Sequence, residues 1–444
     1  MRLIPSFIYL KIRHRKNLIK IVENISWLFF DRILRMTIGL LVGVWFARYL
    51  GPKQYGLFNF ATAFVGLFAA VSGLGLQEIV VRNILHDSKE TNSILGTAGF
   101  LQFCGGVLAY VLVMVFIFVI RPDDSFAIAI VAILGLMLPI KVSEVAIFWF
   151  ESKVNSKYTV WVQNSVLILF ALIKIVLISN RAPLIVFIWL TLIEGLFTGV
   201  LLLLVMNKIG PQLSHLDVTF NRAKALLKES WPLALSGIAI TIYMKIDQIM
   251  LGQMVGDEAV GIYSAATRIS EIWYFIPLVI VSSVYPSIIE SKKQSEIFYY
   301  ARLQKLFNIM FILSISVALP MTFLSSNILL ILFGEPYISG GRILAIHIWT
   351  SVFVFFGVVN GKWFLTENLQ KLVFLRALSG AILNIILNFI LIPFYGGLGA
   401  AIATLLSAIF VNMIIDGLTH RTRVLFIMKL KSLNIFRSIK NVWL

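Results

Sequence analysis

Twelve long apolar runs dominate the 444-residue sequence, and their length restricts the chain to folds that cross a membrane. A spanning helix needs about 20 consecutive apolar residues. Composition agrees, because 59 % of the residues are hydrophobic and 13 % are charged, whereas soluble domains have roughly 45–50 % and about 25 %. The runs are continuous, which argues against the alternating strands of a β-barrel. They fall at about residues 22–47, 55–80, 93–120, 126–150, 158–179, 184–206, 231–253, 259–288, 304–333, 343–365, 373–392 and 397–418.

The distribution of lysine and arginine predicts the orientation. Of the 38 such residues, 25 lie at the termini or in even-numbered connections and five lie in odd-numbered connections. Under the positive-inside rule, both termini are expected in the cytoplasm. The net charge of +17 is thus explained by topology, and we expect no nucleic-acid partner.

A weak internal repeat predicts two halves. Residues 49–58 align with residues 254–263, with two glycines five positions apart in each copy. Glycine-rich hairpins can also resemble one another by chance. Six spans separate the copies, so the halves share one topology, as in transporters with parallel repeats. We predict twelve transmembrane helices in two pseudo-symmetric six-helix halves around a central cavity. The expected segments are an N-terminal half at 1–208, a cytoplasmic linker at 209–229, a C-terminal half at 230–420 and a basic cytoplasmic tail at 421–444.

Charged residues inside the spans are the candidate functional groups. Each ionised side chain at the bilayer centre costs about 2.5–3.5 kcal/mol on insertion scales, so it requires a partner or a wet cavity. Three pairs have the spacing of one helix face: Asp31 with Arg35, Lys141 with Glu144, and Arg268 with Glu271. Such pairs could hold helices together or take part in transport. Lys174 and Lys362 lie near span ends, where we expect them to extend to the interface.

Three arginines predict an anion site. Arg32, Arg35 and Arg268 lie well inside their spans. Guanidinium groups keep their charge in a low dielectric and bind phosphate or diphosphate oxygens in a forked geometry. We therefore expect substrate binding by these three residues together with Lys245. The expected coupling or gating residues are Asp31, Asp247, Glu271, Lys141 and Glu144.

The sequence contains no enzyme motif that residue spacing reveals. The five histidines are scattered, and neither a phosphate-binding glycine loop nor a dinucleotide motif occurs. We expect no enzymatic activity, no metal and no bound cofactor, although H⁺ or Na⁺ could be coupled to transport through Asp247 or Glu271.

Several motifs resemble one family of transporters. The first is ARYLGPKQYG at residues 47–56, and the most specific set combines WPL at 231–233, DQIMLG at 247–252, GIYSAA at 261–266 and RISE at 268–271. A third is YGGLGAAIAT at 395–404. They resemble the Wzx-type flippases of O-antigen and capsule repeat units, in the multidrug/oligosaccharidyl-lipid/polysaccharide exporter superfamily.

The resemblance implies transport of an undecaprenyl-diphosphate-linked oligosaccharide from the cytoplasmic to the periplasmic leaflet of a bacterial inner membrane. It implies a MATE- or flippase-like fold, a monomer, and a polysaccharide polymerase and chain-length regulator as candidate partners. The family's cationic site would match Arg32, Arg35, Asp247, Arg268 and Glu271. The alternatives are a multidrug/cation antiporter of the same superfamily, a relative handling teichoic-acid or peptidoglycan precursors, and a membrane enzyme of polysaccharide assembly.

Overall fold

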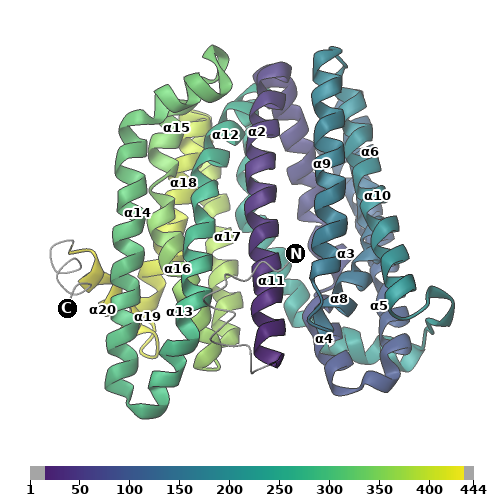
Figure 1. Cartoon of the computed structure of the whole chain (residues 1–444). Helices are drawn as coiled ribbons and strands as arrows, with labels where there is room; N and C mark the ends of the chain where they lie inside the picture. Colours follow the sequence, from purple (N-terminus) through teal and green to yellow (C-terminus); the bar gives the residue numbers. More distant parts are fainter. Residues whose placement is uncertain (1–15, 435–444) are drawn as a thin grey trace. The chain divides into compact units, whose positions relative to one another are not determined.

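The predicted spans are present as helices. The computed structural model describes residues 16–434, and this part of the chain contains helices joined by short turns and no strand (Figure 1). Eleven helical segments in it are long and apolar enough to cross a membrane. The first, Ser26–His86, has 61 residues and covers most of the first predicted span and all of the second. The two spans meet at Gly51 of α2 (Lys16–Leu67), whose φ of 70° interrupts the helix. The prediction of an all-α membrane protein is confirmed, and the eleven segments accommodate the twelve predicted spans if the first is counted as two.

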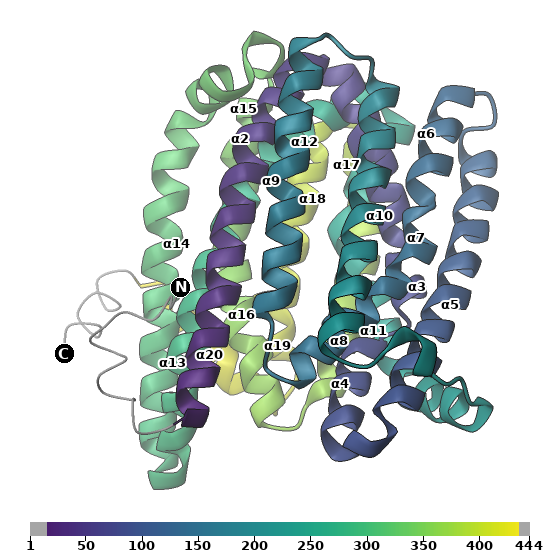
Figure 2. The same cartoon turned by 45° about the vertical axis from the view of Figure 1, so that its right-hand side comes forward.

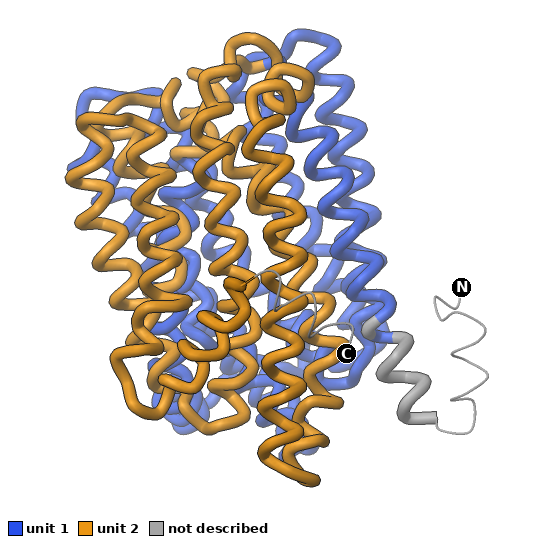
Figure 3. The backbone as a smooth tube through the Cα atoms, turned by 90° about the vertical axis from the view of Figure 1, so that its left-hand side faces the viewer, with its two compact units in different colours: residues 1–49, 61–238 blue, residues 50–60, 239–444 orange. Residues whose placement is uncertain are grey.

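Contacts divide the chain into two compact units, which Figure 3 shows in different colours. Unit 1 comprises residues 1–49 and 61–238. Its core is a cluster of aliphatic and aromatic side chains around α4, α5 and α8. The helices of unit 1 after α2 are α3 (Ala69–Gly73), α4 (Leu76–His86), η1 (Ser88–Glu90), α5 (Thr91–Ile120), α6 (Ser125–Gly135), α7 (Met137–Ile140), η2 (Lys141–Glu144), α8 (Val145–Ser152), α9 (Lys157–Ser179), α10 (Leu184–Ile209), η3 (Leu213–His215) and the first half of α11 (Phe220–Met254).

Unit 2 comprises residues 50–60 and 239–444. Its core lies among α13, α14 and α16. Its helices after α11 are α12 (Asp257–Glu271), η4 (Ile272–Tyr274), α13 (Phe275–Gln294), α14 (Glu296–Phe333), η5 (Glu335–Tyr337), α15 (Gly340–His347), α16 (Thr350–Thr366), α17 (Gln370–Tyr395), α18 (Gly397–Ile409), the π-helix η6 (Phe410–Ile414), α19 (Ile415–Leu418) and α20 (Arg423–Ser432).

The unit boundaries differ from the predicted halves in two places. Residues 50–60, which include all but the first residue of the first repeat copy, belong to unit 2, and the second boundary lies inside α11 rather than in a linker. The expected linker at 209–229 becomes helical from Phe220, and Glu229 on this helix forms an ion pair with Arg82. The division into two six-helix halves therefore stays a prediction.

The two copies of the repeated hairpin pack against each other in unit 2. A Cβ atom at Gly56 would overlap the carbonyl oxygen of Asp257 and lie 2.7 Å from the backbone nitrogen of Gly261. A Cβ at Gly261 would in turn overlap the carbonyl oxygen of Pro52. These are the glycines that the repeat aligns, and their missing side chains allow the two backbones to touch.

The chain after residue 420, which we expected as a tail, contains the packed helix α20. Leu425 and Ser432 on α20 are fully buried. Gln304 of α14 donates to Met428 O and Ser432 Oγ, each at 2.9 Å. Asn308 of α14 accepts from Ser432 Oγ at 2.8 Å. Because these polar groups form hydrogen bonds with one another, they can be buried where α20 packs against α14.

Candidate functional site

In unit 1, two of the predicted charges form one hydrogen-bonded group with α9. Arg35 Nε donates to Asp31 Oδ1 at 2.8 Å, so the predicted i,i+4 pair is present. The Nη2 atom of Arg35 donates to Gln163 Oε1 of α9, also at 2.8 Å. Figure 2 shows α2 and α9 side by side, and Ser156 N donates to Asn24 Oδ1 near the start of the contact. Gln163 was not predicted from the sequence, because its partner is 128 positions away.

Arg32 lies beside this group and is exposed. It forms no hydrogen bond or ion pair with another residue of the described segment 16–434. The charge of Arg35 is compensated by its ion pair with Asp31, whereas Arg32, about one helical turn from Arg35 on α2, adds a positive charge without an ion pair in the described part of the chain. An anion with several oxygens is the ligand that two such neighbouring guanidinium groups favour.

The predicted pair of Lys141 and Glu144 is present, with 3.5 Å between Nζ and Oε1. It lies in η2, a 3-10 segment that follows the short helix α7 containing Pro139. Proline removes a helical hydrogen bond, which explains why this span is broken here. Both side chains are about one third exposed, so the pair adds little to stability.

Lys174 differs from its prediction. Instead of extending to the interface, it forms an ion pair with Glu194 of α10, with a distance of 2.8 Å. A lysine inside a span that can reach a carboxylate on the neighbouring helix is stabilised there. The pair therefore joins α9 to α10 and has a structural role.

In unit 2, Asp247 of α11 is the centre of a buried polar cluster. Its side chain is 4 % exposed. The carboxylate accepts hydrogen bonds from Tyr263 Oη at 2.7 Å, Thr404 Oγ1 at 2.6 Å and Asn388 Nδ2 at 2.9 Å. No lysine or arginine of the described chain forms an ion pair with it. Three donors, on α12, α17 and α18, therefore stabilise its negative charge without neutralising it.

The cluster also contains polar atoms that lack a partner. Asn384 Oδ1 accepts from Asn388 Nδ2 at 3.0 Å, but Asn388 Oδ1 and Asn384 Nδ2 are buried without a hydrogen bond. Buried polar groups are normally satisfied. Oxygen atoms of carboxylate, amide and hydroxyl groups are the ligands of hard cations, so the cluster suits a proton or Na⁺ better than a transition metal. Asp247 was predicted from the sequence as a functional residue, whereas neither asparagine was.

The other predicted residues of unit 2 lie near this cluster. Glu271, at the end of α12, is within electrostatic range of Lys245, Asp247 and Arg268. Arg268 and Lys245 are half-buried, whereas Glu271 is exposed. The structure thus brings the four predicted charges of unit 2 together, with equal numbers of cations and carboxylates.

A second buried charge cluster of unit 2 was not predicted. Asp416 of α19 is fully buried and forms ion pairs with Arg376 of α17 and Lys429 of α20. The π-helix η6 frees backbone carbonyls, and Arg376 and Lys429 donate to Val411 O and Asn412 O there. Burial lowers the pKa of Lys429 from 10.5 to about 8, although Asp416 opposes the effect. The cluster fixes α20 to the last span and has no exposed cation.

Two family models match the chain. The one described as polysaccharide biosynthesis protein matches residues 21–292, and the MatE model matches residues 232–390. The probable low-salt glycan biosynthesis flippase Agl15 of Haloferax volcanii is 24 % identical over 86 % of this chain and 79 % of its own length. The capsular polysaccharide biosynthesis protein CapF of Staphylococcus aureus is 23 % identical over 87 % of this chain and 96 % of its own.

Solved structures share the fold. The lipid II flippase MurJ in an inward closed conformation has a TM-score of 0.70 at 16 % identity, covering 95 % of this chain and 96 % of its own. An inward-facing multidrug resistance transporter of the MATE family has a TM-score of 0.65 at 14 % identity, over 90 % and 96 %. The predicted all-α, MATE- or flippase-like fold is confirmed.

Proposed function

We propose that this protein is a flippase for a lipid-linked oligosaccharide. The proposal starts from its family, since this multi-pass membrane protein belongs to the polysaccharide biosynthesis protein family. The substrate is an undecaprenyl-diphosphate-linked repeat unit of O-antigen or capsule. The flippase moves it from the cytoplasmic to the periplasmic leaflet of a bacterial inner membrane by alternating access. The similarity to a glycan biosynthesis flippase and to a capsular polysaccharide protein supports this function.

The observation that carries the proposal is the pair of arginines on α2. An exposed arginine on a spanning helix is energetically costly, and Arg32 lies beside the partly paired Arg35. Such an arrangement is expected where the transported molecule is an anion. We propose that Arg32, Arg35, Arg268 and Lys245 contact the diphosphate during transport. Because the cell interior is negative, moving about two negative charges outward is favourable by roughly 4–5 kcal/mol per 100 mV.

Complementation of a flippase-deficient strain tests the function and the site separately. The intact chain should restore export and remove accumulated undecaprenyl-diphosphate-linked repeat units. Arg32→Ala, Arg35→Ala and Arg268→Ala should each reduce export about tenfold or more, since a hydrogen bond to a charged group contributes about 1.5–3 kcal/mol. Membrane levels are matched by immunoblot.

Lys208→Ala is the control, because Lys208 is an exposed cation at the end of α10. Equal export by the three arginine variants and this control would contradict the site but leave the flippase assignment intact. Failure of the intact chain in strains with several different repeat units would contradict the assignment itself.

The buried cluster around Asp247 supports coupling of transport to H⁺ or Na⁺. We propose that Asp247 is neutralised by one of these cations in part of the cycle, because its three hydrogen-bond donors are neutral groups. Asp247→Asn, at unchanged protein level, should lower flipping in vesicles and abolish its dependence on a Na⁺ or proton gradient. Glu258→Gln, an exposed change on α12, is the control. Full flipping by Asp247→Asn with the same gradient dependence would contradict the coupling.

A second candidate function is multidrug or cation export, which the match of residues 232–390 to the MatE model favours. The uncompensated charge of Arg32 disfavours a cationic cargo. Increased drug resistance of cells that express the chain, without rescue of polysaccharide export, would favour this candidate. The proposed orientation places both termini in the cytoplasm. A polysaccharide polymerase and a chain-length regulator in the same membrane are further candidate partners.

A further inference from the structure

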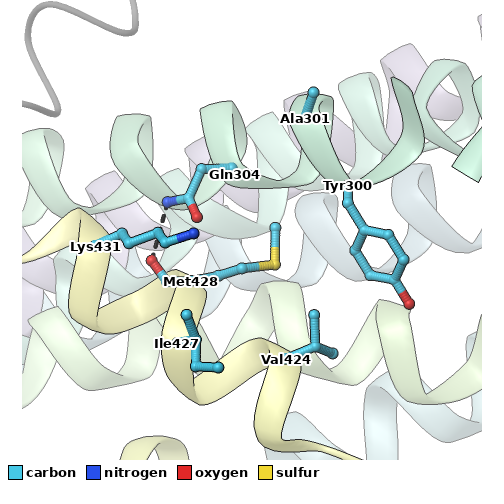
Figure 4. A pocket seen from close by; sticks show the side chains of 7 residues that line it. All are labelled: Tyr300, Ala301, Gln304, Val424, Ile427, Met428 and Lys431. Atoms are coloured by element: carbon cyan, nitrogen blue, oxygen red, sulfur yellow. Dashed lines mark hydrogen bonds between the residues drawn. The ribbon is translucent and has the colours of Figure 1, made fainter. Parts of the chain in front are cut away.

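A cavity of about 450 Å³ lies between α14 and α20 in unit 2, and none of its lining residues belongs to the proposed transport site. Figure 4 shows the side chain of Lys431, on α20, extending toward Gln304 of α14. Apolar side chains of α20 form much of the wall, and polar groups lie at both sides. The lining residues are Tyr300, Ala301, Gln304, Val424, Ile427, Met428 and Lys431.

The helix α20 has two different faces. One face is buried against the bundle, as described above. The other face exposes Arg423, Ile427, Leu430 and Lys431, with Ile427 and Leu430 43 % and 45 % exposed. Ten residues span only about 15 Å as a helix, which is too short to cross a membrane. Apolar residues flanked by cations are the pattern of a helix that lies at the membrane surface.

The charge around the cavity is positive. Lys305 is one helical turn from Ala301 on α14, and Arg423 is one turn from Ile427 on α20. Among the described residues, no carboxylate forms an ion pair with Lys305, Arg423 or Lys431. The sequence contains six lysines and arginines and no acidic residue after position 416. By the distribution of lysine and arginine, this end of the helices is expected on the cytoplasmic side, where anionic lipids attract such clusters.

We propose that the cavity between α14 and α20 binds the headgroup of an anionic phospholipid. The phosphate contacts Lys431, with Lys305 and Arg423 at the rim, and an acyl chain lies along Ile427 and Leu430. The cavity size and the mixture of one cation with apolar walls fit a lipid headgroup. A soluble anion would gain nothing from the apolar wall. This site is independent of the proposed transport activity.

Native mass spectrometry of the purified full-length chain tests the site. Phosphatidylglycerol and phosphatidylcholine are titrated separately into delipidated protein in detergent. We expect tighter binding of phosphatidylglycerol. Lys431→Ala should weaken it about fivefold, the equivalent of about 1 kcal/mol for one basic residue near an anionic lipid surface. Ile427→Ser should weaken binding of phosphatidylglycerol without changing the charge.

Lys371→Ala is the matched control, since Lys371 is an exposed lysine at the start of α17 in the same unit. It should bind phosphatidylglycerol like the intact chain. Equal weakening by Lys371→Ala and Lys431→Ala, or equal affinities for the two lipids, would overturn the proposal. Competition by inorganic phosphate at the lipid concentration would also overturn it, because the site would then bind a free anion. Unchanged melting temperatures of the variants would confirm that they fold.

Discussion

The contact between the two repeated hairpins predicts that an alanine at Gly56 destabilises the protein. The added Cβ would lie 2.6 Å from the carbonyl carbon of Asp257 and 2.7 Å from Gly261 N, whereas ordinary contact begins at 3.4 Å. The contact with the carbonyl carbon alone requires the two backbones to separate by about 0.8 Å, and the overlap with the carbonyl oxygen of Asp257 requires more. Both contacts are to backbone, so no flexible side chain can move aside.

Overpacking of this kind costs about 1–3 kcal/mol, whereas replacing a helical glycine by alanine gains about 0.5–1 kcal/mol. We expect a net destabilisation of about 1–2 kcal/mol for Gly56→Ala. Thermal unfolding of the detergent-solubilised full chain, followed by fluorescence-detected size exclusion, should show a lower Tm. Because unfolding of such proteins is commonly irreversible, variants are ranked at one heating rate.

Gly66→Ala is the control on the same helix, because a Cβ there meets nothing within 4 Å. Its Tm should equal or exceed that of the intact chain, since only the gain in helix propensity remains. If Gly56→Ala and Gly66→Ala melt at the same temperature, the close approach of the hairpins does not contribute to stability, and the reasoning is refuted.

Two further predictions concern charges. Lys174→Met should lower the membrane level of the protein by leaving Glu194 unpaired, and the exchange Lys174→Glu with Glu194→Lys should restore it; an immunoblot in which the exchange is no better than the single variant would count against the pair. For Lys429, the folded-state pKa of about 8 lies below the ordinary 10.5, so unfolding takes up a proton between these pH values. The contribution of Lys429 to the free energy of unfolding should rise over that window. The Tm of the intact chain relative to Lys429→Met should therefore increase from pH 8 to 10, and a constant difference would contradict the lowered pKa.

The sequence predicted those features that depend on neighbours along the chain. The spans follow from runs of apolar residues, and the pair of Asp31 and Arg35 follows from helical spacing. Partners from distant helices left no comparable signal. Gln163 is an ordinary polar residue until α9 packs on α2, and Lys174 meets Glu194 only once α9 and α10 are adjacent.

Asp416 shows a different limit of the sequence analysis. It lies two residues before the end of a predicted span, where a carboxylate would normally reach water. Its burial depends on Lys429, in a segment whose basic composition is typical of a solvated tail. The apolar positions Leu425 and Met428 of that segment, three apart, were the available indication of a packed helix face.

The exchange of residues 50–60 into unit 2 sets an order on biosynthesis. Gly56 and its contact Gly261 are 205 positions apart in the sequence. At a synthesis rate of about 5–20 residues per second, the first hairpin is synthesised roughly 10–40 s before the second. During that interval its glycine backbone is available to other segments, so unit 2 cannot be completed by the C-terminal part of the chain alone. Expression of residues 239–444 without the first hairpin should therefore leave the backbone at Gly261 without its packing partner.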